Sequence, residues 1–153
     1  MNRAVRRGFT LVELLIVVVV LVVLAGLGLL KYIDLRTTAQ TAAVVGDIHA
    51  VTVAVFNYYA AHEAWPPESG PGKVPDGLAT LLPGDLTQVL ARPDYLLDYD
   101  NIPIEGGTPL IAISVTASNP KLQAKLVATF ATKTPFYQNG GKVTYLIAGP
   151  GVF

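Results

Sequence analysis

Few side chains in this sequence belong to the types that carry out catalysis. There are no cysteines, so thiolate nucleophiles, disulfides and cysteine metal sites are excluded. The two histidines, His49 and His62, lie thirteen residues apart on an expected helix, too far apart to share a metal ion. His62 beside Glu63 offers only a weak cation site, and a solvated helix end is the favoured interpretation. The sequence has three serines, Ser69, Ser114 and Ser118, and none of them lies in a nucleophile-elbow motif. We therefore predict no catalytic residues and no enzymatic activity.

A second group of polar residues supplies oxygen ligands of the kind that calcium takes. Asp98, Asp100 and Asn101 lie close together, and acidic residues at alternating positions occur in calcium loops. Only one acidic residue, Glu105, follows them. A strand that ends in a turn explains the same pattern, and we favour it. The sequence thus predicts no metal site and no cofactor.

Charge is distributed unevenly along the chain. The formal net charge is zero, which argues against binding to nucleic acid through bulk electrostatics. Arg3, Arg6 and Arg7 all precede the first long apolar segment. Without residues 1–8, eight basic and eleven acidic side chains remain, a net −3. The basic N-terminal end therefore reads as a separate functional piece.

The apolar segment that follows has the length of a membrane-spanning helix. From Phe9 to Leu30 it holds a single charged residue, Glu13, and as a helix it would extend about 33 Å. The arginines in front place its N-terminus in the cytoplasm. Three interpretations compete: a secretory leader cut near Ala25, a plain membrane anchor, or a specialised processing signal. The first two leave Glu13 unexplained, because a carboxylate inside a bilayer costs at least ~2.5–3.5 kcal/mol.

The residues around Glu13 carry a resemblance that accounts for every feature. The sequence RRGFTLVEL at residues 6–14 closely resembles the processing motif of type IV prepilins and type II secretion pseudopilins. The resemblance implies that a prepilin peptidase cuts between Gly8 and Phe9 and that Phe9 becomes N-methylated. It also implies that Glu13 meets the N-terminal amine of a neighbouring subunit and fixes the register of a filament. The calcium loop of the major pseudopilins is not carried over, because acidic residues are missing after Asn101.

The rest of the sequence predicts a helix followed by a small mixed head. Apolar residues from Val44 to Trp65 recur at spacings of three and four, which extends one helix from Phe9 to about His62. Prolines and glycines at 65–77 end it. We expect short helices at 78–82 and 86–91, strands at 95–99, 110–116 and 142–148, and a turn at 139–141. Ser118-Asn119-Pro120 starts a helix that runs to about Ala131.

These elements define an α+β fold in which a long N-terminal helix packs on a small antiparallel sheet, as in pilins. We expect four parts: a basic leader at 1–8, a transmembrane or filament-core helix at 9–30, an amphipathic half at 31–64 and an α/β head at 65–153.

The leading functional hypothesis is a structural subunit of a type II secretion pseudopilus or a related type IV filament. The resemblance implies other pilin-like subunits, prepilin peptidase, an inner-membrane platform with an ATPase and the lipid bilayer as partners. It places the chain in the bacterial inner membrane, N-terminus inside and head outside, before it enters a periplasmic or surface filament. The alternatives are an unprocessed membrane-anchored binding domain and an adhesive or DNA-uptake type IV pilin.

Overall fold

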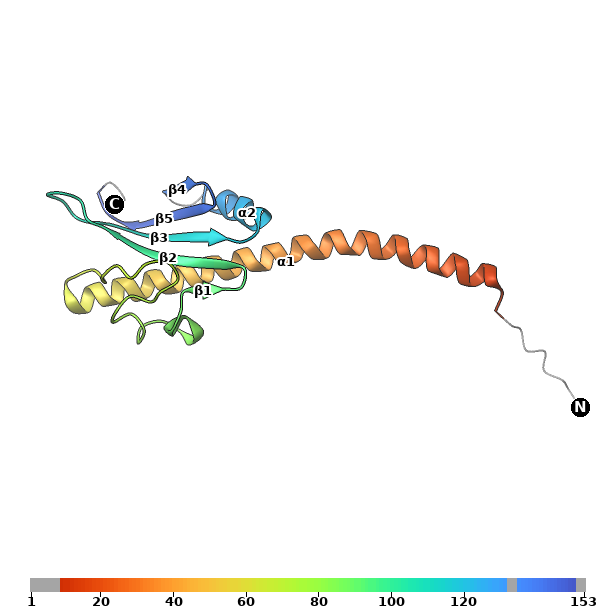
Figure 1. Cartoon of the computed structure of the whole chain (residues 1–153), viewed down its shortest axis with the longest axis horizontal. Coiled ribbons are helices and arrows are strands. Elements are labelled where there is room, and N and C mark those ends of the chain that lie inside the picture. Colours follow the sequence, from red (N-terminus) through yellow and green to blue (C-terminus); the bar gives the residue numbers. More distant parts are fainter. Residues whose placement is uncertain (1–8, 132–134, 151–153) are drawn as a thin grey trace, which may run out of the picture. The chain divides into compact units, whose positions relative to one another are not determined.

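The computed structural model describes residues 9–131 and 135–150; residues 1–8, 132–134 and 151–153 lie outside the described part. The chain divides into two compact units, residues 1–36 and 37–153. One helix, α1 (Leu11–His62), begins in the first unit and ends in the second (Figure 1). The predicted long helix is confirmed, and its start lies two residues later than expected.

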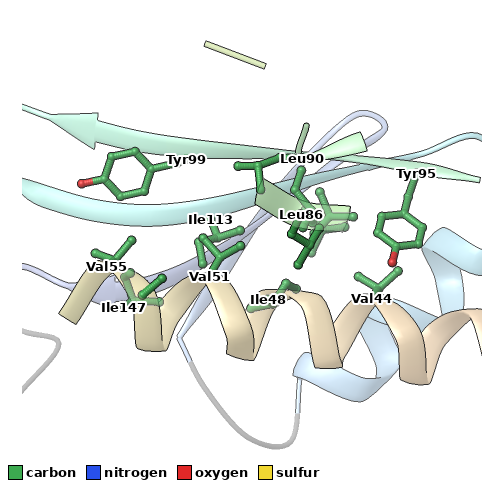
Figure 2. Packing of buried hydrophobic residues seen from close by; sticks show 14 of the residues in the cluster. Val44, Ile48, Val51, Val55, Leu86, Leu90, Tyr95, Tyr99, Ile113 and Ile147 are labelled. Carbon is green, nitrogen blue, oxygen red and sulfur yellow. The ribbon is translucent and has the colours of Figure 1, made fainter. Parts of the chain in front are cut away.

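The second half of α1 is held in the head by one apolar stripe. Val44, Ile48, Val51 and Val55 are buried at spacings of four, three and four, which places them on one face of the helix. Figure 2 shows this face of α1 against the sheet. The helix ends where Glu63 takes a positive φ of 53° and its N–H donates to the Tyr59 carbonyl at 2.8 Å.

The head contains one antiparallel sheet of five strands. The strands are β1 (Ala91–Arg92), β2 (Tyr95–Ile102), β3 (Leu110–Ala117), β4 (Phe136–Asn139) and β5 (Lys142–Ala148), in the spatial order β1-β2-β3-β5-β4. The helix α2 (Pro120–Phe130) connects β3 to β4 and packs against β3 and β5. The predicted α+β architecture, a long helix with a small antiparallel sheet, is therefore confirmed.

The start of α2 follows its sequence signal closely. The Asn119 side chain accepts a hydrogen bond from the Lys121 N–H at 2.9 Å, and Pro120 occupies the first helical position, where its missing N–H costs nothing. Leu122, Leu126 and Phe130 form its buried stripe. The predicted turn at 139–141 is the two-residue loop between β4 and β5, where Gly140 has a φ of 56°.

Two expected short helices are absent from the described residues. At 78–82 the chain forms only turns, in which the Leu78 carbonyl accepts from the N–H groups of Leu81 and Leu82. Pro83 follows too soon for further helical turns, so the cost of starting a helix is not recovered. At 86–91 a 3₁₀ turn, η1 (Gly84–Thr87), is followed by β1, because the backbone of Leu90 bonds to Gly72 and Leu97.

The strand predictions were too short at β2 and missed two elements. β2 continues past Tyr99 to Ile102, with Asp100 and Asn101 paired to Ala112 and Ile111 of β3. The acidic residues therefore lie within a strand rather than in a turn after it. The strands β1 and β4 were not predicted; with two and four residues they are too short to produce a period-two pattern.

The core of the head is formed by one cluster of apolar side chains between residues 44 and 148. Figure 2 shows Tyr99, Ile113 and Ile147 of the sheet above α1, with Leu86 and Leu90 from the segment that joins α1 to the sheet. Every residue of this cluster belongs to the second unit. The head therefore has a core of its own.

Candidate functional site

The N-terminus of α1 carries a reciprocal hydrogen-bonded cap. The Leu14 N–H donates to the Thr10 carbonyl at 3.3 Å, which makes Thr10 the residue that caps the helix. The Glu13 N–H donates to Thr10 Oγ1 at 3.2 Å, and the Thr10 N–H and hydroxyl each donate to Glu13 Oε2 at 3.0 Å. This is a capping box, in which a threonine and a glutamate three residues later satisfy each other's backbone donors.

The cap opens a helical segment whose large apolar side chains are exposed. Every large apolar side chain from Leu11 to Leu30 is exposed, and Phe9 just before the helix is 80% exposed. The segment is long and apolar enough to cross a membrane. Glu13 is the one acidic residue within it. An apolar anchor with a single carboxylate near its start is thus the chief chemical feature of this unit.

Four of the predicted site residues cannot be placed. Arg3, Arg6, Arg7 and Gly8 lie outside the described residues. Phe9 and Glu13 are described, and they stand on either side of Thr10 at the start of α1.

The histidines and serines of the head form no catalytic arrangement among the described residues. His49 is exposed on α1, and His62 stacks on Tyr58 with ring centroids 4.1 Å apart. His62 Nδ1 lies 2.9 Å from the Tyr58 carbonyl oxygen. Within residues 9–131 and 135–150, no three side chains of His, Cys, Asp or Glu gather to hold a metal ion. Ser114 is buried in β3 and donates to the Asp100 carboxylate.

The acidic residues of β2 form an ion-pair network with β5. The Lys142 ammonium donates to Asp98 Oδ2 at 3.0 Å and to Asp100 Oδ1 at 3.3 Å, so it bridges two carboxylates on the same strand face. The Ser114 hydroxyl lies 2.9 Å from the hydroxyl of Thr144 and links β3 to this group. The ammonium of Lys142 thus links the carboxylates of β2 to β5.

Burial and charge act in opposite directions on this network. Burial raises the pKa of Asp98 above its ordinary value of 3.8; the hydrogen bond from Lys142 opposes that rise, and the charge of Asp100 adds to it. Asp98 Oδ1 is buried without a hydrogen-bond partner. Burial works against the charge of Lys142, but the hydrogen bond to Asp98 and the charge of Asp100 raise the pKa of Lys142 overall. The pairing thus favours the charged form of Lys142, whereas burial disfavours the charged form of Asp98.

A second polar cluster attaches α1 to the edge of the sheet. Asp47 accepts from Arg92 Nε at 3.0 Å and from the Tyr95 hydroxyl at 2.6 Å. Burial, together with the bond to Asp47, raises the pKa of Tyr95 well above its ordinary value, so the phenol stays protonated and donates. The cluster binds α1 to β1 and β2 and has the character of a structural clamp.

Comparison with known proteins supports the N-terminal part of this description. Residues 3–29 match the family described as prokaryotic N-terminal methylation motif. No curated protein and no solved structure matches the chain. The chain therefore carries a methylation motif typical of pilin-like prepilin-peptidase substrates, which are membrane-anchored structural proteins rather than enzymes.

Three features of the site were not predicted from the sequence. The Thr-x-x-Glu pattern of residues 10–13 is the signal for the capping box, although Thr10 had no predicted role. The bridge from Lys142 to Asp98 joins residues 44 positions apart and leaves no local signal. An aromatic groove between the end of α1 and the end of β5 also has no local signal, because its residues come from distant parts of the sequence.

Proposed function

We propose that this protein is a structural subunit of a type II secretion pseudopilus or a related type IV filament. Residues 1–8 act as the leader, residues 9–30 as the membrane and filament-core helix, residues 31–64 as the amphipathic half and residues 65–153 as the head. The observation that carries the proposal is the methylation motif at residues 3–29, which overlaps the segment of α1 at residues 11–30 whose large apolar side chains are exposed.

The proposed mechanism is processing followed by assembly. Prepilin peptidase removes the leader after Gly8 and methylates Phe9, which leaves an α-amine that is charged near neutral pH. Glycine at the cleavage position lets the peptidase approach the backbone closely. The exposed apolar surface of α1 then exchanges lipid for the helices of other subunits, on the inner-membrane platform and with its ATPase.

Glu13 has a specific part in this mechanism. The amine of Phe9 enters apolar surroundings in a helical bundle and needs a counter-charge there. Glu13 of a neighbouring subunit provides it, and a buried pair of this kind defines register more than it adds stability. In the single chain the same carboxylate caps its own helix through Thr10, so both roles fall on one side chain.

The absence of cysteine from the sequence favours a pseudopilus over a pilus with a disulfide-closed adhesive loop. Deletion of the gene in the native host tests this choice. A pseudopilus subunit is required for export of secreted proteins, whereas a pilus subunit is required for adhesion or DNA uptake with export intact. An adhesion defect with normal export would contradict the secretion assignment and leave the filament proposal in place.

The first test of the proposal as a whole is the mature N-terminus, measured by mass spectrometry on protein from the native host. We expect a chain that starts at N-methyl-Phe9. A chain that starts at Met1 would instead show an unprocessed membrane-anchored binding domain. A start at Gly26 would show a secreted soluble protein, and either result would refute the filament subunit.

Glu13→Gln tests the role of the carboxylate separately from helix formation. Glutamine can keep the capping box with Thr10, so the variant removes the charge while preserving the start of α1. We expect normal cleavage and membrane insertion but loss of filaments sheared from the cell surface or the membrane. The matched control is Glu63→Gln, which removes an exposed carboxylate after the end of α1 and should assemble normally. Filaments built from the Glu13→Gln protein would refute the register role.

A further inference from the structure

The turn between β4 and β5 contains an asparagine that is followed by a glycine. Asn139 is the last residue of β4, and Gly140 and Gly141 form the loop that returns the chain to Lys142. Asn139, Gly140 and Gly141 are all exposed. Asparagine is one of the chemically labile residue types, because the backbone nitrogen of the next residue can attack its side-chain amide carbon. The reactivity of Asn139 therefore depends on how freely the Gly140 nitrogen can approach it.

The Gly140 nitrogen is unhindered. Gly140 has a φ of 56°, which glycine adopts without strain, and a Cβ built at this position would meet nothing within 4 Å. Within residues 9–131 and 135–150, the Gly140 N–H donates no hydrogen bond. The side-chain amide of Asn139 has no hydrogen-bond partner in the same part of the chain. Neither the attacking atom nor its target is thus held in place by another group.

The other described asparagines are held away from this reaction. Asn57 lies inside α1, where the N–H of the next residue belongs to the helical hydrogen-bond ladder. Asn101 lies in β2, and its side-chain amide donates to a backbone carbonyl at 2.9 Å. Asn119 is followed by Pro120, whose nitrogen carries no hydrogen. Among the described residues, Asn139 is therefore the asparagine that combines a free side-chain amide with a free neighbouring N–H.

We propose that Asn139 is a site of spontaneous deamidation. The Gly140 nitrogen bonds to Cγ of Asn139, the bond between Cγ and Nδ2 breaks, and ammonia leaves with the proton of the Gly140 N–H, so that a cyclic imide forms. Water then opens the imide. Cleavage between the Gly140 nitrogen and Cγ gives aspartate. Cleavage between that nitrogen and the main-chain carbonyl carbon gives isoaspartate, in which the main chain runs through the former side chain.

The isoaspartate form does not fit the present turn. It adds one methylene group to the main chain directly before a two-residue loop, and the length of such a loop determines the turn type and the strand register. Asn139 pairs with Lys142 beside this loop, and the Gln123 side chain donates to the Gly140 carbonyl. β4 is a four-residue strand at the edge of the sheet, next to β5 (Figure 1). The isoaspartate form therefore loses the pairing of β4 with β5, whereas the aspartate form keeps it.

Storage of the full chain in phospholipid nanodiscs, at mildly alkaline pH and raised temperature, tests the chemistry. We expect peptide mass spectrometry to show that the peptide containing Asn139 gains the mass difference between an amide and an acid. Isoaspartyl methyltransferase should label the same peptide. The peptides that contain Asn57 and Asn101 are internal controls and should keep their masses. The matched variant is Asn139→Gln, which should also keep its mass, because the longer side chain would have to form a larger ring.

Hydrogen exchange of the backbone amides at residues 136–139 tests the structural consequence. We expect exchange to become faster in stored wild type, in proportion to its isoaspartate content, and to stay slow in stored Asn139→Gln. Freshly prepared Asn139→Asp should also exchange slowly, because it carries the new charge on a normal main chain. The comparison separates the effect of the altered main chain from the effect of charge. The inference concerns the head alone and does not depend on cleavage, methylation or filament assembly.

Two outcomes would overturn the proposal. An unchanged mass of the Asn139 peptide, or equal mass gains at Asn57 and Asn101, would show that the turn does not promote deamidation. Full protection of β4 in protein that carries isoaspartate at position 139 would show that the turn accommodates the longer main chain.

Discussion

Replacement of Asp98 by asparagine should stabilise the head at neutral pH, although Asp98 takes part in an ion pair. Asp98 is 6% exposed, and its Oδ1 has no hydrogen-bond partner. Lys142 is 40% exposed in its side chain and keeps Asp100 as a second partner at 3.3 Å. The substitution therefore removes a charge from the buried member of the network and leaves the exposed member paired.

The expected size of the effect follows from two opposing contributions. At 3.0 Å the attraction between Lys142 and Asp98 is about 1.4 kcal/mol in water-like surroundings and about 5.5 kcal/mol at an effective dielectric constant near 20. Burial of the carboxylate costs several kcal/mol, and the charge of Asp100 adds repulsion. The raised pKa of Asp98 indicates that the cost exceeds the attraction. We expect Asp98→Asn to increase the free energy of unfolding by up to about 1 kcal/mol, the small difference between these opposing contributions.

The pH dependence provides a second check on the same reasoning. Because the pKa of Asp98 is raised in the folded state, the folded chain binds this proton more tightly than the unfolded chain does. Its contribution to stability is fully present below the ordinary pKa of 3.8 and is lost as the pH rises through the higher folded value. The advantage of Asp98→Asn should thus be greatest at neutral pH and disappear near and below pH 3.8.

Urea unfolding of residues 37–153, followed by circular dichroism at several pH values, measures both effects. This fragment contains the whole core cluster. The comparison variant Lys142→Met leaves buried Asp98 without its cation and should lower the free energy of unfolding by about 1–3 kcal/mol at neutral pH, between the values for exposed and buried pairs. A loss of stability in Asp98→Asn at neutral pH would refute the argument, because it would show that the attraction to Lys142 exceeds the cost of burial.

Two further substitutions test the clamp and a backbone position with the same unfolding assay. Tyr95→Phe removes the hydroxyl that donates to Asp47 at 2.6 Å and should lower the free energy of unfolding by about 1–2 kcal/mol, whereas Tyr137→Phe at an exposed site should have no effect. Gly77→Ala should lower the free energy of unfolding by about 1–2 kcal/mol, because Gly77 has a left-handed backbone with φ 84°. The loss should be larger still because the new Cβ would lie 2.6 Å from the Tyr58 ring. The control Gly46→Ala has open space in α1 and should stabilise the head by up to about 1 kcal/mol; an equal response at both glycines would contradict the conformational argument.

Elements with local sequence signals could be predicted well. The three-four spacing from Val44 to Val55 defines the buried face of α1, and Asn119-Pro120 defines the start of α2. Both signals act within a few residues, through helix geometry and capping. The processing motif at residues 6–14 is local in the same sense, and its recognition agrees with the family match.

Features that depend on pairing across the sheet could not be predicted. The strand β1 exists because Ala91 and Arg92 pair with Leu96 and Tyr95 of β2, beside a hydrogen bond from the Leu97 N–H to the Leu90 carbonyl. Asp100 lies in β2 rather than in a turn because β3 pairs with it and Ser114 and Lys142 satisfy its carboxylate. Register between strands is determined by the burial of whole faces, which a single segment does not reveal.

In the proposed filament, the exposed apolar surface of residues 11–30 has to be covered by lipid or by other helices. Sixteen large apolar side chains are exposed there, and each gains about 1.5–3 kcal/mol when fully buried, so the segment forfeits about 24–48 kcal/mol in water. The segment is exposed whether the head is folded or unfolded, so folding of the head, worth only about 5–15 kcal/mol in an ordinary domain, does not offset this loss. Lipid or other helices must therefore cover the segment.

Lipid tails are as apolar as leucine side chains, so transfer of the helix from the bilayer to a bundle changes its apolar burial little. The polar groups at its start then decide between the two states. A charged residue costs ~2.5–3.5 kcal/mol at the centre of a lipid-embedded helix, and in the proposed filament the amine of a neighbouring subunit would relieve the smaller cost at Glu13. One carboxylate in a segment of uniform apolar character can thus direct both the choice of assembly and its register, which is why Glu13→Gln is expected to abolish filaments while the head stays folded.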